Sequence, residues 1–464
     1  MSDERFDAVI IGSGQAGVPL AKDLAKAGQS VAIVESWHVG GTCVNVGCTP
    51  SKTLAASARV AYLARRSSDF GVTAGEIGTD MPAVIARKRK IVENSNASNI
   101  KGLEKAGATI IMGEGGFAEQ TAAAGEYAIA VKAADGTERR LITKQVFLNA
   151  GERPVVPALK GLDQVPFLDS TSIMELEEVP DHLIVLGAGI VALEFAQMFH
   201  RFGAAVTVIE RGTRLLPHED EDICSCARDI LLEDGLEILF ETEAAEVSGT
   251  TGSIRMKLKD GKELNGTHLL VAIGRRPNVE SLHLDRVGVK QNEHGYIEVN
   301  DLLETNVPGI WALGDVKGPP AFTHVSYDDY RILAANLLHK GSRRVSDRTL
   351  VYTIYTDPEI GRVGMNEMEA RAAGKKIRVA SVPMSYMARA LEMAESRGML
   401  KAIIDTETDL ILGASIVGVE GGEVIAQIQL AMMGGLKYTV LRDAVFSHPT
   451  KSEVLNTLFM SLDS

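Results

Sequence analysis

The 464-residue chain has few cysteines, only two tryptophans and no long run of basic residues. It carries four cysteines and a formal net charge of −13. So few cysteines do not make the disulfide framework of a small secreted protein. The acidic balance disfavours a nucleic-acid partner, since phosphate binding needs a basic surface. The short basic run at residues 87–90 is predicted to be a solvated helix face.

Long apolar runs are also missing, and none approaches the about 20 residues that a membrane-spanning helix needs. The first residues lack the basic, apolar and small-residue succession of a secretory signal peptide. We therefore expect a cytoplasmic protein with no membrane partner. In that compartment a close pair of cysteines is more often catalytic than structural.

Apolar residues and glycine are plentiful. Hydrophobic residues make up 45% of the chain, which at this length is enough for several packed domains. Many of the 45 glycines fall in clusters between an apolar run and a helical pattern. That placement favours repeated βαβ units and an α/β fold.

A glycine-rich turn follows the apolar run at residues 6–11 and precedes a helical pattern. Its GxGxxG spacing places glycines at Gly12, Gly14 and Gly17. Such a turn lets the backbone approach a pyrophosphate, which the helix N-terminus attracts. A second strand at residues 30–34 leads into Glu35, about 20 residues downstream, where a carboxylate can bind ribose hydroxyls. We predict a dinucleotide site here.

The same arrangement recurs later in the chain. A strand at residues 182–186 is followed by Gly187 and Gly189, a helix to residue 202, and a strand at 205–209 that leads into Glu210. Alanine takes the third glycine position, which the fingerprint tolerates. Two dinucleotide sites indicate a relay from a nicotinamide to a tightly held second cofactor, for which FAD is the natural choice.

Charged residues beside the second turn bear on the choice of nicotinamide nucleotide. Glu210 would repel a 2′-phosphate, whereas Arg211 and Arg214 could attract one. We favour NAD(H) over NADP(H).

The cysteine pair lies in a glycine-rich segment, residues 40–52, that reads GGTCVNVGCTPSK. Pro50 is predicted to start a helix that continues through residues 54–64. Cys48 would then lie near a helix N-terminus, where positive potential favours a thiolate. Two cysteines without further ligands nearby make metal binding a poor alternative, and we predict no metal site. The other two cysteines, Cys224 and Cys226, lie in a predicted helix and should not bridge each other.

Residues 40–52 resemble the active-site loop of the class I pyridine nucleotide disulfide oxidoreductases, a family that includes dihydrolipoamide dehydrogenase, glutathione reductase and mercuric reductase. Segments 149–154, 274–278 and 305–315 resemble further signatures of that family. The resemblance implies that Asp315 binds the ribityl chain of FAD. It also implies that Lys52 and Glu194 pair beside the flavin ring. Further cofactor contacts are expected at Gly41, Thr42, Lys52, Gly151 and Gly274.

The segment 447–453 resembles the family's His-Pro-Thr-x-x-Glu motif. The resemblance implies that His448 acts as acid and base toward Cys43, and that Glu453 orients the imidazole. Cys48 would contact the flavin, and Cys43 would exchange with the substrate. In the family this histidine faces the cysteines of the partner subunit, so we expect a homodimer with shared active sites.

The resemblance also implies the architecture: two Rossmann-type dinucleotide-binding domains, for FAD and NAD(P), and a C-terminal α+β dimerisation domain. The predicted parts are an FAD-binding domain at 1–152 and 272–341, an NAD(P)-binding domain at 153–271 and a dimerisation domain at 342–464. Within the last, we predict strands at 350–356, 377–384, 398–405 and 411–419 and a helix at 423–433.

The substrate stays open between a small-molecule disulfide and a metal ion. Mercuric reductases carry a further C-terminal cysteine pair, but no cysteine follows Cys226. Glutathione reductases usually have lysine where this chain has Ser51. Residues 322–331 and 455–459 resemble a mercuric-reductase-like branch that includes reductases linked to reactive chlorine resistance. Alternatives are a dihydrolipoamide dehydrogenase, a diaphorase independent of the cysteines, and a catalytically silent flavoprotein.

Two smaller features allow two interpretations each. The methionines between residues 384 and 399 could line a soft-metal channel, but they are more often packing material. His324 could line the flavin, or it could be a buried, hydrogen-bonded side chain.

Overall fold

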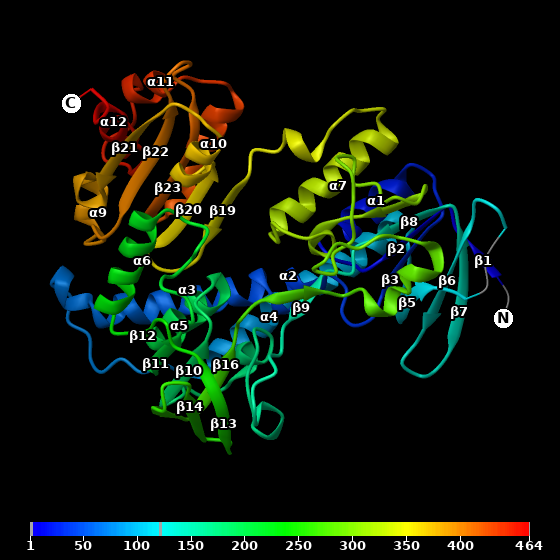
Figure 1. The fold of residues 1–464 in the computed structure, drawn as a ribbon, viewed down its shortest axis with the longest axis horizontal. Helices are drawn as coiled ribbons and strands as arrows, with labels where there is room; N and C mark the ends of the chain where they lie inside the picture. Colours follow the sequence, from blue (N-terminus) through cyan, green and yellow to red (C-terminus); the bar gives the residue numbers. More distant parts are fainter. Residues whose placement is uncertain (1–2, 120–122, 464) are drawn as a thin grey trace. The chain divides into compact units, whose positions relative to one another are not determined.

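The computed structural model describes residues 3–119 and 123–463. The chain forms two compact units, each assembled from three separate segments. Unit 1 comprises residues 1–53, 85–155 and 274–348, and unit 2 comprises residues 54–84, 156–273 and 349–464. Figure 1 colours these segments along the sequence.

A five-stranded parallel sheet forms the centre of unit 1, in the order β18-β8-β2-β3-β4. Its strands are β2 (Ala8–Ile11), β3 (Val31–Glu35), β4 (Thr109–Met112), β8 (Gln145–Leu148) and β18 (Ile310–Ala312). Successive side chains of β2 enter different hydrophobic clusters, Val9 and Ile11 on one face and Ala8 and Ile10 on the other. Both faces are therefore buried, which explains the continuous apolar run in the sequence.

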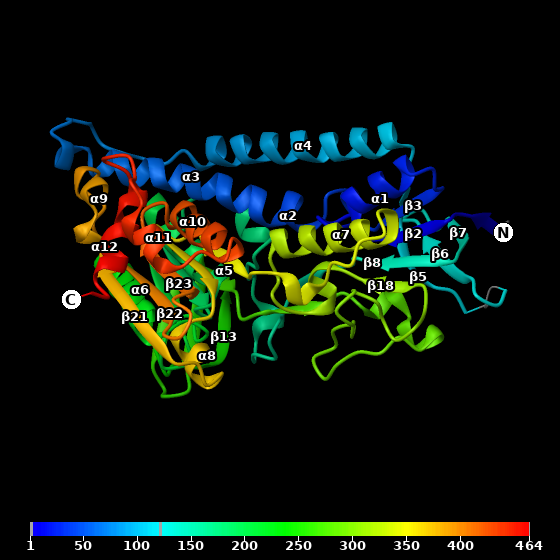
Figure 2. The same cartoon turned by 90° about the horizontal axis from the view of Figure 1, so that it is seen from above.

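Helices α1 (Gly17–Lys26) and α7 (Thr323–Leu338) pack against each other over this sheet, as Figure 2 shows. Helix α4 (Met81–Ala106) supplies Leu103 to the same cluster. Of the basic run in α4, three side chains are exposed, but Lys88 is only 2% exposed. The prediction of a fully solvated face was wrong at that residue, because Lys88 lies three residues after buried Ile85, on the inner side of the helix.

A second sheet in unit 1 has the order β1-β7-β6-β5. Its strands are β1 (Asp3–Arg5), β5 (Glu114–Phe117), β6 (Tyr127–Lys132) and β7 (Glu138–Thr143). Strand β1 is entirely polar and is held to β7 by ion pairs between Glu4 and Arg139 and between Asp3 and Arg140. A two-stranded ladder joins β9 (Glu152–Pro154) to β17 (Arg275–Pro277).

Unit 2 contains a four-stranded parallel sheet in the order β12-β11-β10-β16. The strands are β10 (His182–Leu186), β11 (Ala205–Ile209), β12 (Glu237–Leu239) and β16 (His268–Val271), with helices α5 (Ile190–Phe202) and α6 (Glu221–Glu233). This strand order matches half of a doubly wound dinucleotide-binding sheet. An antiparallel sheet of β13 (Ala244–Thr250), β14 (Ser253–Leu258) and β15 (Glu263–Gly266) is inserted before β16.

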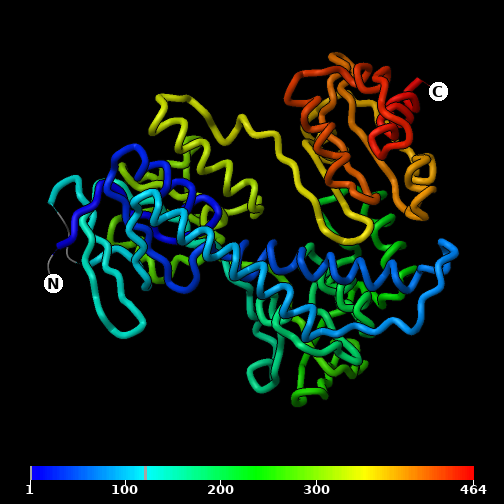
Figure 3. Tube along the Cα trace, turned by 180° about the vertical axis from the view of Figure 1, so that it is seen from behind, coloured from blue at the N-terminus to red at the C-terminus, as the bar shows by residue number. Residues whose placement is uncertain are grey.

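The C-terminal part of unit 2 is an antiparallel sheet in the order β19-β20-β23-β22-β21. Its strands are β19 (Val351–Ile354), β20 (Glu359–Gly364), β21 (Ile377–Pro383), β22 (Met399–Asp405) and β23 (Ile411–Gly418). The trace in Figure 3 runs through it from yellow to orange. The helices are α8 (Glu367–Ala372), α9 (Ala388–Glu392), α10 (Gly421–Met433), α11 (Tyr438–Asp443) and α12 (Val454–Met460).

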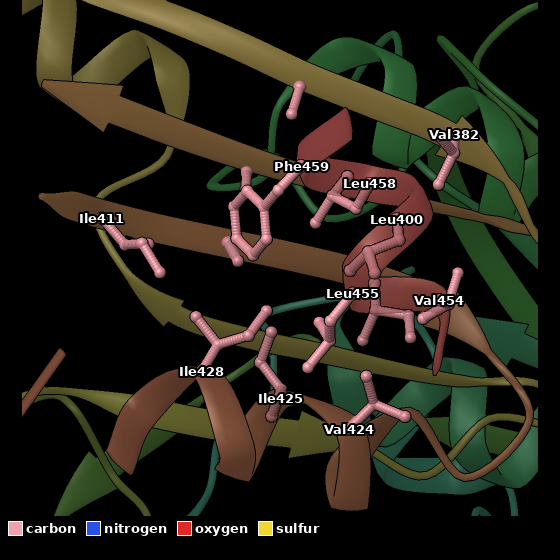
Figure 4. Close-up of a cluster of buried hydrophobic side chains, with 14 of the residues drawn as sticks. Val382, Leu400, Ile411, Val424, Ile425, Ile428, Val454, Leu455, Leu458 and Phe459 are labelled. Carbon is pink, nitrogen blue, oxygen red and sulfur yellow. The ribbon is translucent and has the colours of Figure 1, made fainter. Parts of the chain in front are cut away.

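One face of this sheet carries an apolar core. Leu400 on β22, Ile428 on α10 and Phe459 on α12 are fully buried in it, and Figure 4 shows their side chains converging. The predicted fold class, two Rossmann-type domains and a C-terminal α+β domain, is confirmed. The predicted domain boundaries stay a prediction.

The cysteine segment is more helical than the sequence suggested. Cys43 lies in α2 (Gly41–Val46), and Cys48 is the first residue of α3 (Cys48–Arg65). The predicted start at Pro50 was therefore two residues late, because proline is tolerated throughout the first turn of a helix and need not be its first residue. Short 3-10 helices complete the fold at Ser67–Phe70, Leu162–Gln164, Ser172–Glu175, Glu280–Leu282, Leu284–Val287, Gly314–Lys317, Val345–Asp347, Met384–Tyr386 and Lys451–Glu453. Among the described residues, no helix is long and apolar enough to cross a membrane.

Candidate active site

The first glycine-rich turn is packed so closely that two of its positions exclude a side chain. Gly12 has a φ of +100°, and a Cβ there would lie 2.2 Å from the carbonyl oxygen of Asn149. A Cβ on Gly17 would lie 2.4 Å from the carbonyl oxygen of Gly12. Glycine at these positions therefore lets β2 turn directly into α1, as the sequence pattern predicts.

Asn149 locks this turn from the end of β8. Its Oδ1 accepts a hydrogen bond from the Gly17 amide at 2.9 Å, and its Nδ2 donates to the Leu313 carbonyl at 2.8 Å. The side chain is 7% exposed, so both bonds are shielded from water. Asn149 belongs to the segment 149–154 that resembles a family signature, but this role was not predicted. Its position directly after a buried strand was the available signal.

Glu35, at the end of β3, is held as a hydrogen-bond acceptor. Its Oε2 accepts from the Ser13 amide at 3.0 Å and from the Ser13 hydroxyl at 2.6 Å, and its Oε1 accepts from the Trp37 amide at 2.9 Å. These bonds fix the orientation of the carboxylate beside the glycine turn. That is the place predicted for a ribose-binding carboxylate.

A cavity of about 650 Å³ opens beside this turn, within unit 1. Several predicted cofactor residues line it, namely Gly12, Gly14, Glu35, Gly41, Thr42 and Gly151. The backbone is close-packed around it, because a Cβ on Gly41 would lie 2.7 Å from the Cα of Gly14. A glycine-lined site with a fixed carboxylate fits the adenosine and pyrophosphate parts of FAD.

Asp315, in the turn after β18, is a half-buried carboxylate. Burial raises the pKa of Asp315 above its ordinary range, although Arg275 and a 3.2 Å hydrogen bond from the Ser326 hydroxyl oppose the shift. Such a group gains stability from an additional hydroxyl donor, which fits the ribityl chain of FAD. Asp329, fully buried, holds this turn by accepting from the Gly314 amide at 2.9 Å.

The two cysteines of unit 1 are unbridged, and their side chains share a hydrogen bond. The Sγ of Cys48 also lies 3.2 Å from the Oγ1 of Thr323, the first residue of α7. The hydrogen bond with Cys48 raises the pKa of the Cys43 thiol, and burial and the charge of a Cys48 thiolate raise it further. Cys43 therefore retains its proton in the reduced pair. This contact with Thr323 was not predicted from the sequence, because 275 residues separate it from Cys48.

Lys52 and Glu194 belong to different compact units. Lys52 lies one turn after Cys48 in α3 and is half-buried. Glu194 in α5 is 7% exposed and accepts a hydrogen bond from the Tyr355 amide at 2.8 Å. Their expected pairing beside a flavin stays a prediction.

His448 and Glu453 come together as the sequence predicts. The Nδ1 of His448 lies 3.0 Å from Glu453 Oε2, which also accepts from the Thr450 amide at 3.2 Å. The imidazole itself is 68% exposed. An exposed histidine held through Nδ1 has its Nε2 available for proton transfer.

The second glycine-rich turn, in unit 2, follows the same plan with fewer contacts. Gly187 has a φ of +97°, and a Cβ there would lie 2.6 Å from the Ala272 carbonyl oxygen. A Cβ on Gly189 would meet nothing within 4 Å. Glu210 accepts from the Ala188 amide at 3.0 Å and from the Gly212 amide at 2.6 Å.

The other two cysteines, Cys224 and Cys226, lie in helix α6, away from the glycine-rich segment of Cys43 and Cys48. Cys224 is buried and donates to the Leu216 carbonyl at 3.3 Å. Burial raises the pKa of both Cys224 and Cys226 to about 11. Both thiols are therefore poor nucleophiles at neutral pH. Within residues 3–119 and 123–463, no group of three or more His, Cys, Asp or Glu side chains is placed to hold a metal ion.

The structure bears on both open interpretations. Met384 and Met387 lie in the hydrophobic core under the C-terminal sheet, at 0% and 2% exposure, with Met393 packed against it. This favours packing over a metal channel. His324 is exposed and its ring stacks on Phe322 with 5.5 Å between centroids, so the interpretation as a buried side chain was wrong. His324 is the second residue of α7, and the neighbouring residues Val325 and Ser326 take the buried positions of that turn.

Two dinucleotide turns, a close thiol pair and a histidine–carboxylate pair define a flavoprotein disulfide reductase. Comparison with known families agrees: residues 6–329 match pyridine nucleotide-disulphide oxidoreductase, and residues 350–459 match the dimerisation domain of that family. The chain belongs to the pyridine nucleotide-disulphide oxidoreductases and is an FAD-dependent enzyme that uses a pyridine nucleotide.

Individual relatives refine this placement. The probable pyridine nucleotide-disulfide oxidoreductase RclA of Escherichia coli is 37% identical, over 98% of this chain and 99% of its own length. A mercuric reductase of Staphylococcus aureus is 32% identical, over 99% of this chain and 83% of its own length. Among solved structures, the Cu(II) complex of the HOCl-induced flavoprotein disulfide reductase RclA C43S mutant from Escherichia coli matches with a TM-score of 0.90 at 36% identity, over 98% of this chain and 99% of that chain. The chain is thus a mercuric-reductase-like disulfide oxidoreductase.

Proposed function

We propose that this enzyme passes electrons from NADH through FAD and the pair Cys43 and Cys48 to a small-molecule disulfide or a metal ion. The observation that carries the proposal is the thiol pair itself. Cys48 begins a helix in the same unit as the FAD-type cavity, and Cys43 is hydrogen-bonded to it. A disulfide oxidoreductase needs two thiols close enough to form a disulfide, with one sulfur at a place that favours a thiolate, such as a helix N-terminus.

FAD, when bound, accepts a hydride from the nicotinamide and supplies two electrons to the cysteine pair. Gly12, Gly14 and Glu35 would hold its adenosine and pyrophosphate end, with Gly41, Thr42 and Gly151 along the same cavity. Asp315 would accept a hydrogen bond from its ribityl chain. Lys52 and Glu194 would lie beside the ring, where a cation favours negative charge on the flavin.

Cys43 then exchanges with a disulfide substrate. After Cys43 gives up its proton, its sulfur attacks one substrate sulfur, the substrate S–S bond breaks, and one thiol leaves with a proton. The Cys48 thiolate next attacks the Cys43 sulfur, and the second substrate sulfur leaves as a thiolate that takes a proton from water. This restores the Cys43–Cys48 disulfide. Two electrons have moved from the cysteine pair to the substrate.

The partner subunit's His448 would take the proton from Cys43 and return it to the leaving thiol, oriented by Glu453. A homodimer with shared active sites supplies this contact, and the family's dimerisation domain at residues 350–459 supports it. The exposed imidazole, already fixed through Nδ1, supports the same assembly. We place the enzyme in the cytoplasm, where thiols remain reduced.

NADH is the proposed donor rather than NADPH. Glu210 lies at the end of β11, the ribose-binding position of the second dinucleotide turn, and two backbone amides fix its carboxylate. A fixed carboxylate accepts bonds from a free 2′-hydroxyl and repels a 2′-phosphate. Because Gly187, Gly189 and Gly274 have no side chains, the nucleotide could approach the backbone closely there.

The test is turnover with NADH against lipoamide, glutathione disulfide, Hg(II) and Cu(II), in the wild type and in Cys43→Ser. Cys226→Ser serves as the matched control, because it makes the same chemical change at a thiol outside the proposed site. We expect Cys43→Ser to lose roughly 100-fold or more in kcat/KM on the preferred acceptor, and the control to stay within about twofold. Undiminished turnover in Cys43→Ser would instead establish a diaphorase that does not use the cysteines.

A further inference from the structure

Thr323 brings a hydroxyl to the cysteine pair from a distant part of the sequence. Its Oγ1 lies 3.2 Å from Cys48 Sγ, well within the range of a hydrogen bond to sulfur. Both residues belong to unit 1, so the contact lies inside one compact body. The hydroxyl can donate one proton, and it can rotate to direct that proton at a sulfur.

Two helices begin at this contact. Cys48 is the first residue of α3, which has 18 residues, and Thr323 is the first residue of α7, which has 16. The N-terminal ends of both helices carry partial positive charge, which favours an anion between them. The hydroxyl of Ser51 is directed elsewhere, at 3.4 Å from the Cys48 carbonyl oxygen. Thr323 is therefore a side-chain donor in direct reach of a Cys48 thiolate.

The same hydroxyl also acts on the second sulfur. A hydrogen bond with Thr323 lowers the pKa of the Cys43 thiol, against the larger rise that Cys48 and burial cause. A hydroxyl with a single proton can donate to only one sulfur at a time. Because Cys43 holds its own proton, Cys48 is the sulfur that needs the donor.

We propose that the Thr323 hydroxyl donates a hydrogen bond to the Cys48 thiolate of the reduced enzyme and thereby sets the thiolate population and reduction potential of the cysteine pair. This inference rests on the proposed function of the pair. Thr323 is a positioning residue, since it acts through Cys48 and takes no part in bond making.

The redox balance gives the direction of the effect. Reduction of the Cys43–Cys48 disulfide by two electrons and one proton yields the Cys43 thiol and the Cys48 thiolate. A bond that stabilises the thiolate stabilises the reduced state and raises the reduction potential. Without the hydroxyl, the pair is harder to reduce, and Cys48 holds a proton up to a higher pH.

On the three helices, the titratable residues nearest to this contact in sequence are Cys43 on α2, Lys52 on α3 and His324 on α7. Further along the same helices lie Arg59, Tyr62 and Arg65 of α3, and Tyr327, Asp328, Asp329, Tyr330 and Arg331 of α7. Thr323→Val keeps all of these residues, nearly preserves side-chain volume and removes only the hydroxyl. Thr323→Ser keeps the hydroxyl and serves as the rescue variant. Thr323→Ala also removes the hydroxyl. It is the second variant because the smaller alanine side chain cannot crowd the start of α7 as valine could.

The experiment uses the purified holoenzyme and two readouts other than activity. The first is the equilibrium of the cysteine pair with reduced and oxidised glutathione, measured by thiol trapping and mass spectrometry. The second is the pH dependence of the long-wavelength absorbance that a Cys48 thiolate gives beside the bound flavin.

For Thr323→Val and Thr323→Ala we expect the equilibrium to move roughly tenfold toward the disulfide, which is about 30 mV. The midpoint of the absorbance profile should rise by roughly one pH unit, the effect of losing a hydrogen bond to a charged group. Thr323→Ser should match the wild type within about threefold. Equal equilibria and profiles in the wild type and in both hydroxyl-free variants would overturn the role of Thr323.

The outcome is separable from that of the proposed function. If Cys43→Ser abolishes turnover and the hydroxyl-free variants behave as the wild type, only the inference about Thr323 fails. If Cys43→Ser leaves turnover intact, the function proposed for the pair fails, whatever Thr323 does to the glutathione equilibrium.

Discussion

In the first glycine-rich turn a buried side chain closes the loop, whereas in the second the corresponding space is open. A Cβ on Gly14 would lie 2.9 Å from Asn149 Oδ1, but a Cβ on Gly189 would meet nothing within 4 Å. The third fingerprint position is Gly17 in one turn and the fully buried Ala192 in the other. The second helix thus stands far enough from its strand to accommodate a methyl group.

The carboxylate beside the first turn is also held by more contacts than the carboxylate beside the second turn. Glu35 accepts three hydrogen bonds and is 8% exposed, whereas Glu210 accepts two and is half-buried. A carboxylate that is already held by several hydrogen bonds loses less conformational freedom when a ligand binds to it. The difference suits a retained cofactor in the first site and an exchanging nucleotide in the second, and five substitutions test it.

The largest effect is expected from exchanging the third position of the two turns. Gly17→Ala places a Cβ 2.4 Å from the Gly12 carbonyl oxygen, so we expect loss of most bound FAD and about 3 kcal/mol or more of unfolding free energy. Ala192→Gly removes a methyl group from a helix and should cost about 1 kcal/mol with FAD content unchanged. Flavin absorbance of the purified variants and urea unfolding measure both. Equal FAD content in the two variants would refute the difference between the turns.

Asn149→Ala should come next, because it leaves the Gly17 amide and the Leu313 carbonyl buried without their partner. Each such group costs about 1–3 kcal/mol. We expect an FAD dissociation constant raised by roughly tenfold or more, measured by fluorescence during dialysis, with KM for NADH within about twofold of the wild type. A change in the KM for NADH with an unchanged FAD dissociation constant would contradict the assignment of Asn149 to the FAD site.

Glu210→Ser tests the second carboxylate. Removing the negative charge relieves repulsion of a 2′-phosphate and loses an acceptor for the 2′-hydroxyl. The ratio of kcat/KM for NADPH over NADH should rise by roughly tenfold, with FAD content unchanged. Steady-state kinetics with both nucleotides measure the ratio, and an unchanged ratio would remove Glu210 from nucleotide selection.

The smallest effect concerns the pH dependence of the FAD-free protein. The pKa of Asp315 is raised by burial above its ordinary value of 3.8. The folded state therefore binds this proton more tightly than the unfolded state does, and stability falls as pH rises from about 4 through the raised pKa. Asp315→Asn should remove that loss.

The urea midpoint of the FAD-free Asp315→Asn protein should therefore exceed that of the wild type at pH 7 and approach it near pH 4. FAD affinity should fall at the same time, because the acceptor for the ribityl chain is lost. A lower midpoint in the variant at pH 7 would mean that the carboxylate stabilises the fold instead.

Local patterns in the sequence predicted the two dinucleotide units well. Strands β10 and β11 have the predicted ends, because each is a buried apolar run bounded by loop residues. Strand β20 (Glu359–Gly364) was missed, because its apolar residues are interrupted by Gly361 and Arg362. The polar strand β1 was missed as well, since it is held by ion pairs to β7 rather than by burial.

The candidate site shows the same limit. The His448–Glu453 pair is five residues apart and was predictable from its motif. The contact between Cys48 and Thr323 joins residues 275 apart, and no local periodicity reports it. The bonds of Asn149 to Gly17 and Leu313 likewise span 132 and 164 residues.

The most direct test of the account is an anaerobic titration with dithionite that counts the electrons taken up by the holoenzyme. The wild type and Cys226→Ser should each accept four electrons per subunit, two in FAD and two in the cysteine pair. Cys43→Ser and Cys48→Ser should accept two. Uptake of only two electrons by the wild type would mean that Cys43 and Cys48 are not redox-active, which would contradict the account.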